Sequence, residues 1–102
     1  MYIAHAATYA SENWQVKEGS EDEFVSRWAQ FLRWTRDNIP GFLEATLIRD
    51  AGDPRHFVSF ARWDDEASRE AWGAPGFEEK FGACRELCED FQGGPFIPVA
   101  SV

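Results

Sequence analysis

Hydrophobic residues recur at helical spacing in one long segment of the chain. One stripe of a helix is formed by Phe24, Trp28, Phe31, Leu32 and Thr35. The pair Ser20 and Glu23 before this stripe has the spacing of a capping box, in which each side chain accepts from the other residue's backbone N–H. Pro40-Gly41 cannot continue a helix. The pattern therefore predicts a helix from Ser20 to about Asn38.

Three segments in the first two thirds of the chain are typical of β-strands. Phe42 to Arg49 and Phe57 to Trp63 are short runs of strand-forming residues joined by a turn at residues 50–55, which predicts an antiparallel hairpin. An earlier strand is expected from Ile3 to Val16. Its alternation separates His5, Ala7, Tyr9 and Ser11 from Ala6, Thr8, Ala10, Glu12 and Trp14.

The last third of the chain predicts two further helices and a final strand. Asp64 or Asp65 can cap a short helix through Trp72, and Pro75 can open another. An apolar stripe along that second helix is formed by Phe77, Phe81, Cys84, Cys88 and Phe91. Gly93-Gly94-Pro95 is expected to break the helix, and Phe96 to Val102 to form an edge strand.

The resulting order, β-α-β-β-α-β, is the plan of a ferredoxin-like α+β fold. Such a chain forms a four-stranded antiparallel sheet with its helices on one face. The other face is left bare, and the chain has no spare element to cover it. We therefore expect residues 1–102 to form a single domain that pairs with a second copy as a homodimer.

Composition narrows the possible partners. Nine Phe, five Trp and two Tyr are many for 102 residues, so some rings should line a pocket or a subunit interface. The net charge is -8, and the Lys and Arg residues are scattered. Such a surface repels nucleic acid and anionic membranes. The chain has no long apolar run and no secretory pattern at its start, so a cytoplasmic location is expected.

The sequence holds no specific catalytic or metal-binding motif. His5 and His56 each stand alone at a strand end and are candidate proton shuttles, although such histidines are more often only solvated or hydrogen-bonded. Cys84 and Cys88 stand one helical turn apart, a spacing that permits a disulfide or two metal ligands. With no further Cys or His nearby, we expect a reduced, partly buried pair and no metal site.

The aromatic residues of the predicted third strand and the helices are the candidates for a binding site. Trp63 shares one strand face with the small Ser59 and Ala61. A flat apolar cavity between sheet and helices is one interpretation, and a packed aromatic core is the other. The expected lining beside Trp63 is formed by Trp28, Phe31, Trp72, Phe77 and Phe81.

Short motifs over most of the chain carry a family resemblance. Trp63-Asp64-Asp65-Glu66-Ala67, with Trp72 and Pro75-Gly76-Phe77, resembles the strand-to-helix signature of the antibiotic biosynthesis monooxygenase family. Lys17 to Glu21 and Ile39 to Phe42 resemble that family's first-helix start and its entry to strand two. The resemblance implies a dimeric α/β barrel. It also implies a monooxygenase that oxidises anthrone-like polyketide intermediates with O2 and uses no metal, flavin or haem.

The resemblance assigns roles to individual residues. Trp63 matches the pocket Trp of those oxygenases, Ser59 stands where an Asn is expected, and Arg69 stands where a Tyr is expected. Ser59 can donate to a phenolate, and Arg69 or Arg85 can stabilise an enolate. Haem-degrading proteins of similar fold carry a set of Asn, Trp and His residues. In this chain Glu12 and Phe81 stand in place of the Asn and the His, which disfavours haem cleavage.

Three functions remain as hypotheses from the sequence. The first is an oxygenase without cofactors that acts on a flat aromatic or polyketide-derived molecule. The second is a non-catalytic or stress-associated module that binds a small apolar ligand. The third is an isomerase or cyclase that uses the same pocket, with His5 or His56 as the shuttle.

Overall fold

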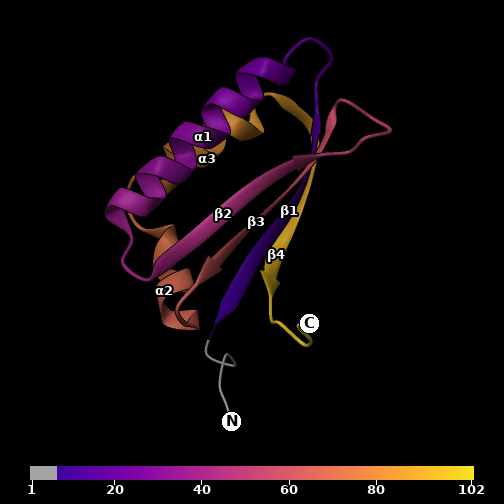
Figure 1. The fold of residues 1–102 in the computed structure, drawn as a ribbon. Helices are drawn as coiled ribbons and strands as arrows, with labels where there is room; N and C mark the ends of the chain where they lie inside the picture. The colour runs from indigo at the N-terminus through magenta and orange to yellow at the C-terminus, as the bar shows by residue number, and fades with distance from the viewer. Residues whose placement is uncertain (1–6) are drawn as a thin grey trace.

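The chain folds into a four-stranded antiparallel sheet with helices packed on one face (Figure 1). The structure is a computed structural model that describes residues 7–102. In chain order the elements are β1 (Thr8–Val16), α1 (Glu21–Asn38), β2 (Phe42–Arg49), β3 (His56–Trp63), α2 (Glu66–Glu70), the 3-10 helix η2 (Ala71–Gly73), α3 (Phe77–Arg85) and β4 (Cys88–Phe96). The predicted ferredoxin-like α+β fold is confirmed.

The strand order is β2-β3-β1-β4, so β1 and β3 form the centre of the sheet and β2 and β4 its edges. All three pairings are antiparallel. Glu12 of β1 lies opposite Ser59 of β3 on one side and opposite Gly93 of β4 on the other. This register fixes which side chains meet on the helix-covered face.

The core lies between α1, α3 and the helix-covered face of the sheet. Alternate residues of β1 and β3 are buried there, as the period of a strand requires. Trp14, Phe57 and Trp63 are each at most 2 % exposed. Burial of one such apolar side chain contributes roughly 1.5 to 3 kcal/mol. Helix α1 adds Phe24 and Phe31 to the same core.

The last helix and strand differ from the sequence-based prediction. Helix α3 ends at Arg85, and Gly93-Gly94-Pro95 lies inside β4 rather than breaking a helix. Because β4 is an edge strand, it tolerates Pro95. A Cβ on Gly93 would come within 2.7 Å of Glu12 Cγ, so this strand position needs a glycine. The predicted strand over Phe96 to Val102 is therefore wrong.

Two further sequence-based predictions, both for the start of the chain, are compared with the structure. The first strand begins at Thr8, and the part expected over residues 3–6 lies outside the described residues. Ser20 is the N-cap residue of α1, but its side chain makes no cap hydrogen bond. Instead, the Ser20 carbonyl accepts the first helical bond from the Phe24 N–H at 2.9 Å.

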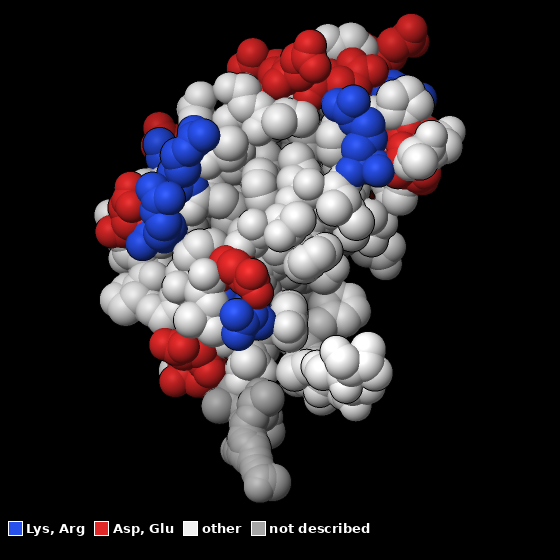
Figure 2. Space-filling view, viewed as in Figure 1, with Lys and Arg blue, Asp and Glu red and all other residues white. Residues whose placement is uncertain are grey.

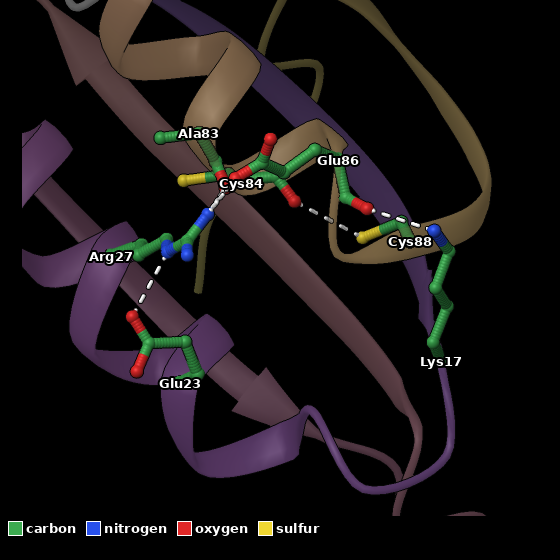
Figure 3. Close-up of polar contacts among 7 residues, drawn as sticks. All are labelled: Lys17, Glu23, Arg27, Ala83, Cys84, Glu86 and Cys88. Atoms are coloured by element: carbon green, nitrogen blue, oxygen red, sulfur yellow. Dashed lines mark hydrogen bonds and ion pairs between the residues drawn. The ribbon is translucent and has the colours of Figure 1, made fainter.

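A polar cluster ties α1 to the turn between α3 and β4 (Figure 3). Arg27 of α1 donates from Nε to Glu23 at 2.9 Å and from Nη1 to the Ala83 carbonyl at 2.8 Å. It also pairs with the Glu86 carboxylate, and Lys17 donates to the Glu86 carbonyl at 3.0 Å. These contacts hold the C-terminal end of α3 against α1.

The two cysteines lie in this same region but not on one helix. Cys84 lies near the end of α3, whereas Cys88 is the first residue of β4. The prediction that both cysteines stand one turn apart on the same helix is therefore wrong. Both are buried and free, and Cys88 Sγ lies 3.6 Å from the Cys84 carbonyl oxygen (Figure 3). Burial raises the pKa of Cys84 to about 12 and that of Cys88 to about 11, so both thiols stay protonated near neutral pH.

The second sheet face has no helix over it (Figure 1). It carries exposed apolar side chains, among them Ile48 and Phe60. The surface seen in Figure 2 has most of its charged groups near the margin and uncharged atoms across the middle. Within residues 7–102, no helix is long and apolar enough to cross a membrane.

Candidate functional site

A cavity of about 240 Å³ lies between the helix-covered sheet face and the helices. Functional pockets usually measure about 300 to 1,000 Å³, so this one suits a small ligand. The described residues that line it come from β1, α1, η2, α3 and β4. They are Glu12, Trp14, Phe31, Trp72, Phe77, Phe81, Phe91, Gly93 and Gly94.

The rings around the cavity support each other by stacking and edge contacts. Phe31 and Trp72 are stacked, with centroids 5.4 Å apart and planes at 7°. Phe77 and Phe81 are stacked at 5.4 Å and 8°. Ring pairs at these distances hold their partners in place. The wall is therefore a set of apolar surfaces suited to a flat aromatic ligand.

Glu12 is the only ionisable side chain among the described residues that line the cavity. Its position follows from strand alternation, which turns Glu12 to the same sheet face as Trp14. The absence of a side chain at Gly93, directly opposite on β4, leaves the room that Glu12 occupies. The cavity thus combines aromatic walls with one carboxyl group.

Ser59 connects the Glu12 carboxyl group to the indole of Trp14. Trp14 Nε1 donates to Ser59 Oγ at 2.9 Å, and Ser59 Oγ donates to Glu12 Oε1 at 2.7 Å. Burial raises the pKa of Glu12 to about 7, and the bond from Ser59 partly offsets this effect. Glu12 is therefore poised to gain or lose a proton near neutral pH.

The structure brings four of the predicted binding residues together and separates the others. Phe31, Trp72, Phe77 and Phe81 all line the cavity. Trp28 instead lines two grooves between α1 and β2, of about 350 and 410 Å³.

Arg85 lies behind the cavity wall. It donates to the Cys88 carbonyl at 3.1 Å, and its guanidinium carbon lies 6.0 Å from the centroid of the Phe91 ring. Arg85 thus contacts the lining residue Phe91 but does not itself line the cavity.

The three residues predicted as catalytic occupy different environments. Ser59 is 1 % exposed and contacts the cavity through Glu12. Trp63 is fully buried one layer deeper, where its ring lies 5.2 Å from that of Trp72. Arg69 lies on α2 and is not among the lining residues. Trp63 Nε1 and Arg69 Nε are buried and have no hydrogen-bond partner among residues 7–102.

Of the two candidate proton shuttles, only His56 can be placed, and it does not line the cavity. His5 lies outside the described residues. His56 begins β3, where its ring nitrogens lie 2.9 Å from Asp50 Oδ2 and 2.9 Å from Asn13 Oδ1. Strand alternation turns His56 to the sheet face opposite to Ser59.

Sequence reasoning did not select Glu12, Trp14, Phe91 or the two glycines of β4 as site residues. One signal for Glu12 was available, because alternation puts this acid on an otherwise apolar strand face between Ala10 and Trp14. The β4 residues were not accessible in this way, since Phe91 fits a helical stripe and Gly93-Gly94 was expected to break that helix. No cluster of three or more His, Cys, Asp or Glu side chains that could hold a metal ion occurs in the described part of the chain.

Comparisons with known proteins agree with this architecture. The crystal structure of SnoaB, a cofactor-independent oxygenase from Streptomyces nogalater, is 26% identical, with a TM-score of 0.85 over 95% of this chain and 97% of that chain. A conserved protein from Methanosarcina mazei Go1 is 18% identical, with a TM-score of 0.79 over 91% and 93% of the two chains. A structure described as an antibiotic biosynthesis monooxygenase is 20% identical, with a TM-score of 0.73 over 93% and 99%.

A search of curated proteins found no match. The model of the family described as antibiotic biosynthesis monooxygenase, by contrast, matches residues 9–79, which include β1 to the start of α3 and most of the cavity wall. This match spans more than half of the chain. The chain therefore belongs to the antibiotic biosynthesis monooxygenase family.

Proposed function

We propose that the protein is an oxygenase that oxidises a small flat aromatic or polyketide-derived molecule with O2, without metal, flavin or haem. The observation that carries this proposal is the cavity with stacked aromatic walls, in which Glu12 is the single ionisable group among the described lining residues. The likeness to SnoaB, which is described as a cofactor-independent oxygenase, supports the same reaction class.

The residues of the cavity would act mainly by binding and by excluding water. Stacked rings such as Phe31 and Trp72 give a flat ligand apolar contact on its faces. In this low-dielectric space an electron-rich substrate anion reacts with O2, and charged neighbours have a strong effect on it. We assign Trp63 to positioning, because it packs behind Trp72. Ser59 would act through Glu12, and Arg69 remains a candidate for stabilising negative charge.

Oxygen uptake tests this proposal. Chelator-treated protein is mixed with anthrone or a hydroquinone in an oxygen electrode, beside a blank without protein. We expect protein-dependent uptake that falls at least about 10-fold in Trp72→Leu, which removes part of the wall, and in Trp63→Phe, which removes the ring that packs behind Trp72. Trp28→Leu is the matched control, since Trp28 lines the two grooves between α1 and β2 and does not line the cavity.

The possible outcomes separate the hypotheses. Uptake equal to the blank, together with saturable ligand binding, would contradict the oxygenase and favour a binding module. Uptake that is unchanged in Trp63→Phe but lost in Trp72→Leu would remove Trp63 from the site and keep the cavity. Product formed under argon would favour an isomerase or cyclase.

We also propose that the bare sheet face pairs with a second copy of the chain. The sheet face opposite the helices carries Ile48 and Phe60, which are 49 % and 37 % exposed. Arg62 and Glu44 form an ion pair on the same face, with Nε and Oε2 2.8 Å apart. Sedimentation of Phe60→Asp beside the wild type tests this proposal. We expect the variant to be monomeric, and a wild-type monomer at micromolar concentration would contradict the pairing.

A further inference from the structure

Glu12 differs from the other acidic residues of the described chain in its surroundings. It is partly buried in a cavity whose other lining side chains are aromatic or absent. A carboxyl group in such surroundings costs stability when it is ionised. The presence of a carboxyl group at this position is explained if it has a chemical task.

The hydrogen bonds of Glu12 distinguish its two oxygens. The indole N–H of Trp14 can only donate, so the Ser59 hydroxyl must accept from Trp14 and donate to Glu12. Oε1 is thereby committed as an acceptor. Oε2 has no hydrogen-bond partner among the described residues, so it is the oxygen that can take up a proton.

Among residues 7–102, no charged side chain faces Glu12 across the cavity or contributes to the shift of its pKa. The shift of its pKa to about 7 arises from burial, which raises it, and from the bond with Ser59, which lowers it. The neighbours that face it are Ser59 from β3, Gly93 from β4, Phe31 from α1, Trp72 from η2, and Phe77 and Phe81 from α3. The group is thus tuned near neutrality by its surroundings, as general bases commonly are.

We propose that Glu12 is the general base that removes a proton from the bound substrate, with Ser59 and Trp14 holding its carboxylate in place. This assignment rests on the proposed function, and it identifies the residue that begins the reaction. A substrate of this base must carry a proton acidic enough for a carboxylate to remove, and a flat aromatic ketone with an activated methylene group serves as the test case.

The chemical step balances with O2 as the oxidant. The Glu12 carboxylate takes a methylene proton, and the electron pair of that C–H bond stays on the substrate as an enolate. O2 forms a C–O bond with this carbon and gives, after protonation, a hydroperoxide. Loss of the second methylene proton and cleavage of the O–O bond then yield a ketone and water. Four electrons pass from the substrate to one O2.

Hydrogen–deuterium exchange separates the proton transfer from the oxidation. Anthrone is incubated with the protein in D2O under argon, and loss of its methylene proton signal is followed by NMR. We expect the wild type to accelerate exchange above the blank, and Glu12→Gln to reduce the accelerated rate about 100-fold or more. The wild-type rate should rise with pH about a midpoint near 7, the pKa of Glu12.

Glu78→Gln is the matched control, since Glu78 is an exposed residue of α3 that does not line the cavity. This variant should exchange at the wild-type rate. A second variant, Ser59→Ala, removes the bond that lowers the pKa of Glu12, so the pH midpoint should move upward. Circular dichroism of each variant establishes that it is folded.

The results distinguish this inference from the oxygenase proposal. Exchange that depends on Glu12, without protein-dependent oxygen uptake in air, would support the base and contradict the oxygenase. Oxygen uptake with unchanged exchange and an unchanged pH profile in Glu12→Gln would overturn the base and keep the oxygenase. Wild-type exchange no faster than the blank would also overturn the assignment of Glu12.

Discussion

The buried carboxyl group of Glu12 makes the stability of the folded protein depend on pH in a specific direction. Its pKa is about 7 in the folded chain against an ordinary value of 4.5. The folded state therefore holds this proton more tightly than the unfolded state. Stability contributed by the protonated form is fully present below pH 4.5, and it is lost as the pH rises to about 7. Replacement of Glu12 by Gln removes this dependence.

The magnitude follows from the size of the shift. One pKa unit corresponds to about 1.4 kcal/mol, so the shift from 4.5 to about 7 costs the folded state about 3 kcal/mol when Glu12 is fully ionised. Between about pH 5.5 and about pH 8.5 the cost grows by roughly 2 kcal/mol. Gln stays neutral, and its carbonyl oxygen can still accept the bond from Ser59. We therefore expect the stability of Glu12→Gln relative to wild type to rise by about 2 kcal/mol over this range.

Urea unfolding followed by tryptophan fluorescence measures this difference, with both proteins at one fixed concentration. Glu78→Gln serves as the control, because Glu78 is exposed on α3 and does not line the cavity. A difference between Glu12→Gln and wild type that is constant from about pH 5.5 to about pH 8.5 would refute the reasoning. The carboxyl group would then titrate as it does in the unfolded chain.

Other positions give independent tests. Ser59→Ala should lower the free energy of unfolding by about 1 to 3 kcal/mol in urea titrations, because the buried indole N–H and the carboxylate that its hydroxyl bridges lose their partner. Gly93→Ala should destabilise by about 1 to 3 kcal/mol, since its Cβ would lie 2.7 Å from a cavity side chain, whereas Gly94→Ala meets nothing within 4 Å and should change stability much less. Cys84 and Cys88 should react with a disulfide reagent about 100-fold more slowly in the folded protein than in urea, because burial raises the pKa of both thiols. Equal rates in the two states would show that the thiols are accessible.

Sequence patterns located most of the fold because burial in this chain follows regular periods. The stripe through Phe24, Phe31 and Thr35 is buried in α1, and Asp65 caps α2 by accepting from the Ser68 N–H at 2.8 Å. The boundary after α3 was missed, because Cys88 and Phe91 fit a helical stripe as well as a strand face. Pairing with β1 decides between them, and such non-local pairing is not encoded in the local pattern.

The same periodic patterns of hydrophobic residues predicted part of the candidate site. Phe31, Trp72, Phe77 and Phe81 were found because they are large and lie on predicted helices near one strand face. The depth of a residue cannot be read from its type, so the sequence could not separate the lining Trp72 from the deeper Trp63. The importance of Glu12 depends on its pairing across two strands.

The outer edge of β4 also bears on how the protein behaves at high concentration. An exposed strand edge offers unpaired backbone groups to any other extended chain, and it is a common starting point for aggregation. In β4 this edge carries Glu89 and Asp90 at one end and Pro95 at the other, where the backbone lacks an N–H. Acidic side chains repel a second copy of the same acidic chain, and the proline interrupts any further ladder of hydrogen bonds. The strand that completes one wall of the cavity therefore also protects the sheet against growth by strand addition on that side.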